Sequence, residues 1–341
     1  MVTPNVTDVP ADPNNKHDAY FRTVMQRPAN AASELRTVLP KSLAELVNWE
    51  KLELQSTSFI STELGTRYGD LLFRTRLNDH DAYICLLIEH QSSNDRLMAL
   101  RILEYMVHVW NHHLDQKPRP KTLPAVIPLV VHSTPTGRTW TAPRDIIDLI
   151  DLDPTTLAAA GPYLPRLRYL LDDLNRIDTA RLLTRDLTPE ALFTLFLIKT
   201  APANKHVTID LQHSRDLIEK ILEGPDGPRD FSVALTYIMR VGDTDPAEIE
   251  AFVDEFGPRA KEAYVTTAER LEARGEARGE ARGEARGEAR GRAETLLDLL
   301  TLKFGPLPEG VVATVRAGDA EQLRGWTADV LTAQHLDQIF G

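Results

Sequence analysis

The sequence contains a single cysteine, Cys85, in 341 residues, which excludes a disulfide within the chain. A lone cysteine in an apolar run usually packs as a small hydrophobic side chain, and the lack of a disulfide framework is typical of a reducing compartment. No apolar run reaches the roughly 18 residues of a membrane-spanning helix. The N-terminus has neither the basic start nor the apolar stretch of a secretion signal. These absences predict a cytoplasmic protein with no membrane partner.

The common nucleotide and zinc motifs are also missing. The sequence has no GxxxxGK, GxGxxG or CxxC pattern, so nucleotide hydrolysis, dinucleotide binding and zinc fingers have no support. His108 and His112 have HxxxH spacing, but position 109 is valine, where a metalloprotease has glutamate.

Basic residues are fewer than acidic ones, since 39 Lys and Arg against 50 Asp and Glu give a formal net charge of −11. Residues 1–140 contain 15 basic and 15 acidic side chains, so the whole excess of negative charge lies after residue 140. This balance argues against a general nucleic-acid coat. A neutral region still binds DNA where local positive patches contact phosphates, and we expect such binding to be weak and sensitive to salt.

Composition and periodicity divide the chain into five segments. We predict a flexible arm (1–15), an α/β core (16–140), a helical extension (141–262), a charged repeat forming a helix or linker (263–291) and a small C-terminal helical domain (292–341). Within the core, the patterns predict helices at 29–47 and 95–114 and strands at 52–60, 70–77, 82–89 and 125–132. The first helix should be interrupted near Pro40, and Ser92, Ser93 or Asn94 should cap the second. Pro128 predicts an edge strand or a bulge.

The polar segment 78–81 indicates a hairpin between two of these strands. If Leu77 and Ala82 flank the loop, Asp70 lies directly opposite Glu89, and Gln91 points to the same face. Two opposed carboxylates repel each other, and a divalent cation would remove that cost. The pairing depends on the register, since a shift of one residue would offset it.

Glu89 is unusual because it ends a run, 83–88, that is apolar on both faces, as in a central buried strand. A carboxylate in that position is costly unless it is paired or bound to a metal. The alternative is that the strand simply ends there, and that residues 89–91 form a solvated loop.

Several motifs resemble known nucleases. An aspartate opening one strand, followed by an apolar strand ending in Glu-X-Gln and then a helix, resembles the PD-(D/E)XK nuclease core. More narrowly, the sequence resembles the Rpn family of recombination-promoting nucleases, also called putative transposases, over roughly residues 15–200. The resemblance rests on His17-Asp18-Ala19-Tyr20-Phe21, Leu39-Pro40, Ser58-Phe59-Ile60, Asp70-Leu71-Leu72, Leu86-Leu87-Ile88-Glu89-His90-Gln91-Ser92, Arg101-X-X-X-Tyr105 and 123–128.

This resemblance implies an α/β restriction-endonuclease-like core with a mixed sheet flanked by helices, and Mg²⁺-dependent hydrolysis of DNA phosphodiesters. Asp70 and Glu89 would hold the metal, which would activate water and stabilise charge on the phosphate. Gln91 stands where the superfamily usually has lysine. Glutamine cannot act as a general base at neutral pH, and would only orient water or phosphate.

Five further residues are weaker candidates for a DNA-binding or supporting role, each with a structural alternative: His17, Asp18, Glu34, Arg101 and Tyr105. Arg101 and Tyr105 are one helical turn apart and could contact a phosphate, or hydrogen-bond back to the core. His17 and Asp18 could contact substrate, or cap and pack the first helix. Glu34 could join the acidic site, or be a solvated helix residue.

The tetrapeptide EARG is repeated five times over 272–291. In a helix, glutamates four residues apart form one stripe and arginines another, so like charges meet and opposite charges do not. Each glycine costs roughly 0.8–1.0 kcal/mol relative to alanine. The block is therefore either a flexible charged linker or a helix that pairs with a second copy of the chain.

Two classes of function remain. The first is a metal-dependent DNA endonuclease linked to recombination or mobile elements. The second is a catalytically weak or inactive nuclease fold acting as an interaction module. Gln91 and the net negative charge after residue 140 favour this second class, whereas the presence of Asp70 and Glu89 argues against it. Strand transfer by a transposase has less support, because no DDE-type triad can be placed in the sequence.

Overall fold

The computed structural model describes residues 16–57, 71–90, 95–117 and 120–340. It separates into two units, Met1–Thr267 and Ala268–Gly341. Within the described ranges, no helix combines the length and the apolar character needed to cross a bilayer.

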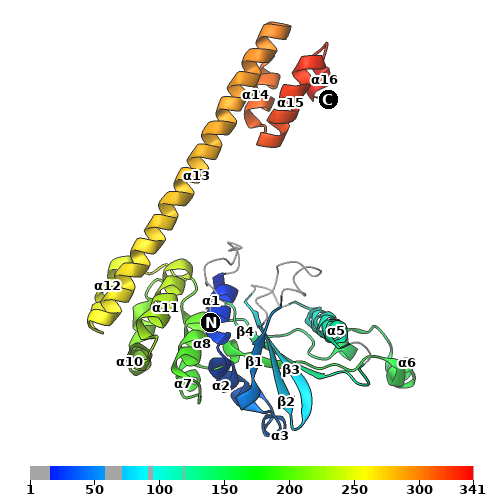
Figure 1. The fold of residues 1–341 in the computed structure, drawn as a ribbon, viewed down its shortest axis with the longest axis vertical. Helices are drawn as coiled ribbons and strands as arrows, with labels where there is room; N and C mark the ends of the chain where they lie inside the picture. The colour runs from blue at the N-terminus through cyan, green and yellow to red at the C-terminus, as the bar shows by residue number, and fades with distance from the viewer. Residues whose placement is uncertain (1–15, 58–70, 91–94, 118–119, 341) are drawn as a thin grey trace. The chain divides into compact units, whose positions relative to one another are not determined.

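A five-stranded mixed sheet forms the centre of the first unit (Figure 1). Its strands lie in chain order: β1 (Glu53–Gln55), β2 (Leu71–Leu77), β3 (His80–Glu89), β4 (Ala125–His132) and β5 (Leu170–Asp173). The first three strands pair antiparallel, and β3, β4 and β5 pair parallel. The expected α/β class with a mixed sheet is therefore confirmed.

Helices cover both faces of this sheet (Figure 1). The described residues of the first unit include the helices α1 (Lys16–Met25), α2 (Pro28–Val38), α3 (Lys41–Ala44), α5 (Met98–Gln116), α6 (Pro154–Ala160), α7 (Thr179–Leu183), α8 (Pro189–Thr200), α9 (Val207–Leu211), α10 (Arg215–Glu223), α11 (Gly227–Val241) and α12 (Pro246–Asp254). Alternate residues of β3 enter different cores, as the two-residue period of a strand requires. Cys85 and Leu87 pack with α5, whereas Leu86 and Ile88 pack with α1, α2 and α8.

The second core joins parts of the chain that are far apart in sequence. Phe21 of α1 and Leu35 of α2 share it with Phe196 of α8 and Phe231 of α11. A bidentate ion pair adds to this packing, since Arg27 donates to both carboxylate oxygens of Asp230 at 2.6 Å. The segments 16–140 and 141–262 therefore share one hydrophobic core.

The β2–β3 hairpin differs from the expected register. Leu77 pairs with His80, so the loop has two residues, Asn78 and Asp79, and Asn78 has a φ of 51°. A positive φ is typical of two-residue hairpin turns, and asparagine tolerates it well. His80 and Asp81 extend the strand. Leu71 consequently pairs with Leu86, and the predicted pairing of Asp70 with Glu89, which needs Leu77 opposite Ala82, is wrong.

Two local expectations also change. β4 lies between β3 and β5 and is not an edge strand, although its pairing with β5 starts only at Leu129. Pro128 therefore lies where β4 has one paired neighbour. The helix expected from residue 95 begins at Met98, with Leu97 at the cap position, and Asp95 accepts a hydrogen bond from the Leu97 N–H at 2.8 Å. The predicted caps at 92–94 lie outside the described residues.

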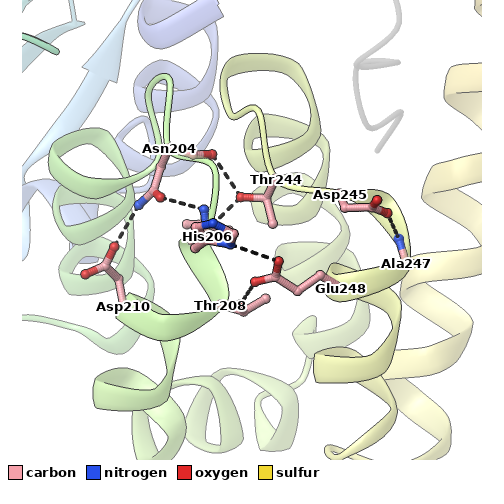
Figure 2. Close-up of polar contacts among 9 residues, drawn as sticks. Asn204, His206, Thr208, Asp210, Thr244, Asp245, Ala247 and Glu248 are labelled. Atoms are coloured by element: carbon pink, nitrogen blue, oxygen red, sulfur yellow. Dashed lines mark hydrogen bonds and ion pairs between the residues drawn. The ribbon is translucent and has the colours of Figure 1, made fainter.

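A polar network joins the segment before α9 to the start of α12 (Figure 2). Asn204 accepts from the His206 N–H at 2.9 Å and donates to Asp210 at 2.7 Å. Glu248 accepts a hydrogen bond from the Thr208 hydroxyl and contacts His206 at 3.3 Å. These bonds satisfy the polar groups of a tight turn, and we assign the network to stability.

The second unit has a core of its own. It contains α14 (Glu309–Ala317), α15 (Ala320–Thr332) and α16 (Asp337–Phe340), packed on the end of the long helix α13 (Pro258–Phe304). Leu296 and Leu300 of α13 are fully buried there, and Asp319 opens α15 with a capping box. The segment 292–341 is helical, as expected, but residues 292–304 belong to the long helix α13 and not to a separate short helix.

Helix α13 runs without a break through the EARG block, so the flexible-linker interpretation is wrong. Glu288 pairs with Arg292, and Arg290 with Glu294 at 3.3 Å. These pairs form where the repeat ends, because Arg292 and Glu294 are out of phase with the repeated charges and lie four residues from an opposite charge.

Candidate active site

The carboxyl ends of the three parallel strands bring a row of polar side chains together. Glu89 of β3 is in register with His132 of β4, which is in register with Asp173 of β5. All three are buried, with exposed fractions of 4%, 0% and 7%. Neighbouring strands lie about 4.8 Å apart, so the row spans about 10 Å. In open α/β sheets, this edge is where ligands bind.

Glu89 lies on the face of the sheet that α5 covers, and its carboxylate is ion-paired. Arg101 of α5 donates to Glu89 Oε2 at 3.2 Å, and the same nitrogen, Nη1, donates to Asp95 at 2.8 Å. The positive charge of the guanidinium offsets part of the cost of removing the Glu89 carboxylate from water. Glu89 is therefore part of a buried charged group, and the solvated-loop interpretation is wrong for this residue.

The other two predicted catalytic residues, Asp70 and Gln91, lie outside the described residues. Among the side chains that are described, no group of three or more histidine, cysteine or acidic residues is placed to hold a metal ion. Mg²⁺ keeps several waters and needs only one or two protein carboxylates. Glu89 fits one such anchor, since it is a buried oxygen donor at the end of a rigid strand.

His17 reaches the same end of β3 from α1. Its ring lies against that of His90, the residue after Glu89, with ring centroids 3.5 Å apart. The hydroxyl of Tyr237 in α11 lies 2.7 Å from His17 Nδ1. Burial, followed by the charge of Lys16, lowers the pKa of His17 to about 4, and burial and the other histidines lower the pKa of His90 to about 3. Both rings are therefore neutral at pH 7, which allows them to stack.

Asp18 and Tyr105 are both buried. Asp18 is 8% exposed in the first turn of α1, and Tyr105 is 3% exposed in the core between α5 and the sheet. Arg101, one helical turn before Tyr105, forms an ion pair with Glu89.

Glu34 belongs to a different buried cluster. It is fully buried on α2, and its nearest cationic partner is Arg185 at 3.5 Å. Arg185 also makes a bidentate pair with Asp172 of β5, with both distances 2.7 Å. Asp172 is in register with Val131, which packs in the core of α1, α2 and α8, so Glu34 lies on the side of the sheet away from Glu89. The solvated-helix alternative for Glu34 is wrong.

His132 was not predicted from the sequence. Its ring packs edge-on against Trp140 at 4.8 Å, and its Nε2 lies 3.2 Å from the carbonyl oxygen of Arg138. Within the described part of the chain, His132 Nδ1 has no hydrogen-bond partner. The sequence analysis did not assign β4 as the parallel neighbour of β3, and only that pairing places His132 beside Glu89.

An open cavity of about 340 Å³ lies beyond this row, at the β5 edge of the sheet. Trp140, Arg144, Asp173 and Arg176 are among its lining residues. Asp173 accepts a hydrogen bond from the Trp140 N–H at 2.8 Å and pairs with Arg176 at 3.3 Å. Asp172, the other acidic residue of the lining, pairs with Arg185, so both aspartates already have a cationic partner.

Comparison with known proteins agrees with the sequence motifs. The curated relatives include the inactive recombination-promoting nuclease-like protein RpnE of Escherichia coli K12, 29% identical over 272 residues, or 77% of this chain and 83% of RpnE. The recombination-promoting nuclease RpnA of the same strain is 28% identical over 274 residues, covering 76% and 84%. RpnD of Escherichia coli O157:H7 is 35% identical over 116 residues, covering 34% and 44%.

No solved structure matches the chain. The model of the family described as "Putative transposase, YhgA-like" matches residues 15–224, a range that includes all five strands and the row at their carboxyl ends. Because this match covers more than half of the chain, the protein belongs to the family described as "Putative transposase, YhgA-like", and it is similar to the Rpn recombination-promoting nucleases.

Proposed function

We propose that this protein is a metal-dependent DNA endonuclease with a PD-(D/E)XK-type core, acting in recombination. The observation that carries the proposal is the buried, ion-paired carboxylate of Glu89, at the carboxyl end of the central strand of a mixed sheet. Two relatives named as recombination-promoting nucleases support the class of activity.

In this proposal, Glu89 and Asp70 hold Mg²⁺ through carboxylate oxygens. The ion supplies an activated water and stabilises the charge that develops on the phosphate. Gln91 orients the water or a phosphate oxygen by hydrogen bonding, since an amide cannot accept a proton at neutral pH. Arg101 provides positive charge beside Glu89, where a DNA phosphate would approach.

The second candidate function is an interaction module that has lost cleavage activity. The relative RpnE, named as inactive, favours it, because RpnE matches over most of both chains. The presence of both Asp70 and Glu89 favours the enzyme, since these are the two carboxylates that the proposed metal site needs.

The two candidates differ in a plasmid-nicking assay with the purified protein. A nuclease would convert supercoiled plasmid to nicked or linear DNA in Mg²⁺ and would be inactive in EDTA. A metal titration followed by calorimetry shows whether cation binding and cleavage appear together. DNA binding without cleavage, at any concentration of Mg²⁺ or Mn²⁺, would favour the interaction module.

We also propose that the EARG region of α13 mediates homodimerisation. Its five glycines together cost roughly 4–5 kcal/mol relative to alanine. A Cβ atom built on Gly275, Gly279, Gly283, Gly287 or Gly291 would have no atom within 4 Å, so a second backbone has room to approach. In a pair of chains, the arginine stripe of one helix faces the glutamate stripe of the other, which relieves the repulsion within each helix.

Sedimentation equilibrium of the full chain tests this assembly. We expect a dimer at low salt that dissociates in 1 M NaCl, because the Debye length falls to about 3 Å and the charge stripes are screened. Replacing Glu276, Glu280 and Glu284 by arginine should also give a monomer with reduced helicity in circular dichroism. A wild-type monomer with full helicity at low salt would contradict the proposal.

A further inference from the structure

Arginine side chains gather around the open cavity at the β5 edge of the sheet. Arg144 and Arg176 are among its lining residues. Arg168 belongs to a segment that lies beside Arg144, because the Tyr169 N–H donates to the Arg144 carbonyl oxygen at 3.3 Å. Three separate stretches of the chain therefore bring positive charges to this edge.

The guanidinium of Arg144 is held by a neutral group. Its Nε and Nη2 donate to the Tyr169 carbonyl oxygen at 3.4 Å and 3.2 Å. Burial, followed by the charge of Arg168, lowers the pKa of this guanidinium, and the charge of Arg176 adds to the effect. Among the residues that the structure describes, no carboxylate forms an ion pair with Arg144. A half-buried charge beside like charges is costly, and a bound anion would offset that cost.

The carboxylates near these arginines are engaged elsewhere. The two aspartates of the cavity lining have cationic partners of their own. Asp145 lies opposite Arg168 in an isolated β-bridge, but its carboxylate accepts the Ile147 N–H at 3.3 Å. Arg138 is also exposed close by, and its carbonyl oxygen accepts from Asn175 Nδ2 at 2.8 Å. Within the described part of the chain, neither Arg138 nor Arg168 has a carboxylate partner.

The cavity reaches the side of the sheet that carries Glu89. Leu171 of its lining packs in the core that contains Leu87, the residue two positions before Glu89. Asp173, also in the lining, ends the row of in-register residues that begins at Glu89. Two strand spacings of about 4.8 Å separate the ends of that row. One strand of a duplex carries a charge about every 3.4 Å of helix axis, so this distance corresponds to about three nucleotides.

We propose that Arg144 and Arg168 form a phosphate-binding subsite for the DNA strand that lies across Glu89. This inference rests on the proposed function, and it adds the place where the backbone of the substrate is held. Contacts to phosphate fix the register of a protein on DNA without reading its sequence. The subsite therefore selects which phosphate of the strand reaches Glu89, and it does not select a base sequence.

Fluorescence anisotropy of a labelled DNA duplex with the full chain in Ca²⁺ tests the subsite. Arg144→Gln and Arg168→Gln should each weaken binding by about fivefold at low salt, as expected for the loss of one charged hydrogen bond. The slope of log affinity against log salt concentration should fall by about 0.9 for each variant, and by about twice that for the double variant. A purely structural role for these arginines would leave the slope unchanged.

Arg229→Gln is the matched control. Arg229 is exposed on α11, a helix that packs on the other face of the sheet, and the variant has the same change of charge. Its affinity and salt slope should equal those of the wild type. Thermal unfolding checks each variant, and Arg168→Gln keeps the test decisive if Arg144→Gln, which loses its bonds to Tyr169, is unstable.

The possible results separate this subsite from the nuclease activity. Wild-type affinity and salt slope in folded Arg168→Gln would overturn the subsite while leaving the nuclease intact. Binding of inorganic phosphate that Arg144→Gln abolishes, with duplex affinity unchanged, would also overturn it, since the site would then hold a small phosphate ligand. A wild-type protein that binds the duplex but does not nick plasmid, with weaker binding in both variants, would overturn the nuclease and support the subsite. A wild-type protein that does not bind DNA overturns both proposals.

Discussion

Replacing Glu89 by glutamine should reduce the Mg²⁺-dependent DNA cleavage that we propose by roughly a thousandfold. In that proposal the loss follows from removing a metal-binding carboxylate, since metal ions stabilise the reacting phosphate by several kcal/mol and each 1.4 kcal/mol is about tenfold in rate. The fold should survive the change, because glutamine has the same shape and Arg101 keeps its ion pair with Asp95 at 2.8 Å. The measurement is the initial rate of plasmid nicking, with thermal unfolding as the check on folding.

Glu104→Gln is the matched control for this experiment. Glu104 lies on α5 and is exposed, so the same chemical change there should leave the nicking rate and stability unchanged. A Glu89→Gln protein that remains folded and nicks plasmid at the wild-type rate would remove Glu89 from the active site.

Arg185→Met should destabilise the first unit by about 3–5 kcal/mol, the usual cost of breaking a buried ion pair by removing one partner. Arg185 is the shared cation of Glu34 and Asp172, and both carboxyl groups are at least 95% buried. Without it, two acidic groups face each other in the core. Urea unfolding followed by circular dichroism measures the loss, and Arg181→Met, on the exposed part of α7, is the control.

Glu34→Gln should instead stabilise the first unit, and the gain in stability should depend on pH. Burial, followed by the charge of Asp172, raises the pKa of Glu34 well above its usual value. Above pH 4.5 the unfolded chain releases this proton while the folded chain retains it, so wild-type stability falls as pH rises. Glutamine has no proton to lose and can donate to Asp172. The variant should match the wild type near pH 4 and exceed it by about 1–3 kcal/mol at pH 8. Equal stability at both values of pH would contradict the assignment.

The sequence predicted those elements that depend only on the order of apolar and polar residues within one short segment. The apolar run 83–88 and the carboxylate after it identified the central strand and Glu89, because burial on both faces leaves few places for a charge. The register of the hairpin was wrong by two residues because His80 and Asp81 are polar, yet lie on the solvent end of β3. Polarity alone does not distinguish such a strand end from a loop.

The elements that the sequence missed depend on distant partners. β5 contains two aspartates in four residues, a composition that argues against a buried strand. Asp172 is tolerated because Arg185 pairs with it, and Asp173 because it accepts the Trp140 N–H. Asp95 and His132 likewise join the site only through the packing of α5 and the parallel pairing of β4. No spacing rule along the chain places them beside Glu89.

The long-range packing of α1 has a consequence for how the protein is made. His17 is 220 residues from Tyr237, and Arg27 is 203 residues from Asp230. At synthesis rates of roughly 5–20 residues per second, α1 leaves the ribosome roughly 10–45 s before α11 does. Phe21 and Met25 are fully buried in the folded protein, but during that interval the α11 side chains that pack in the same core have not yet been made. The packing around α1 and the His17 side of the site are therefore completed only when translation has passed α11.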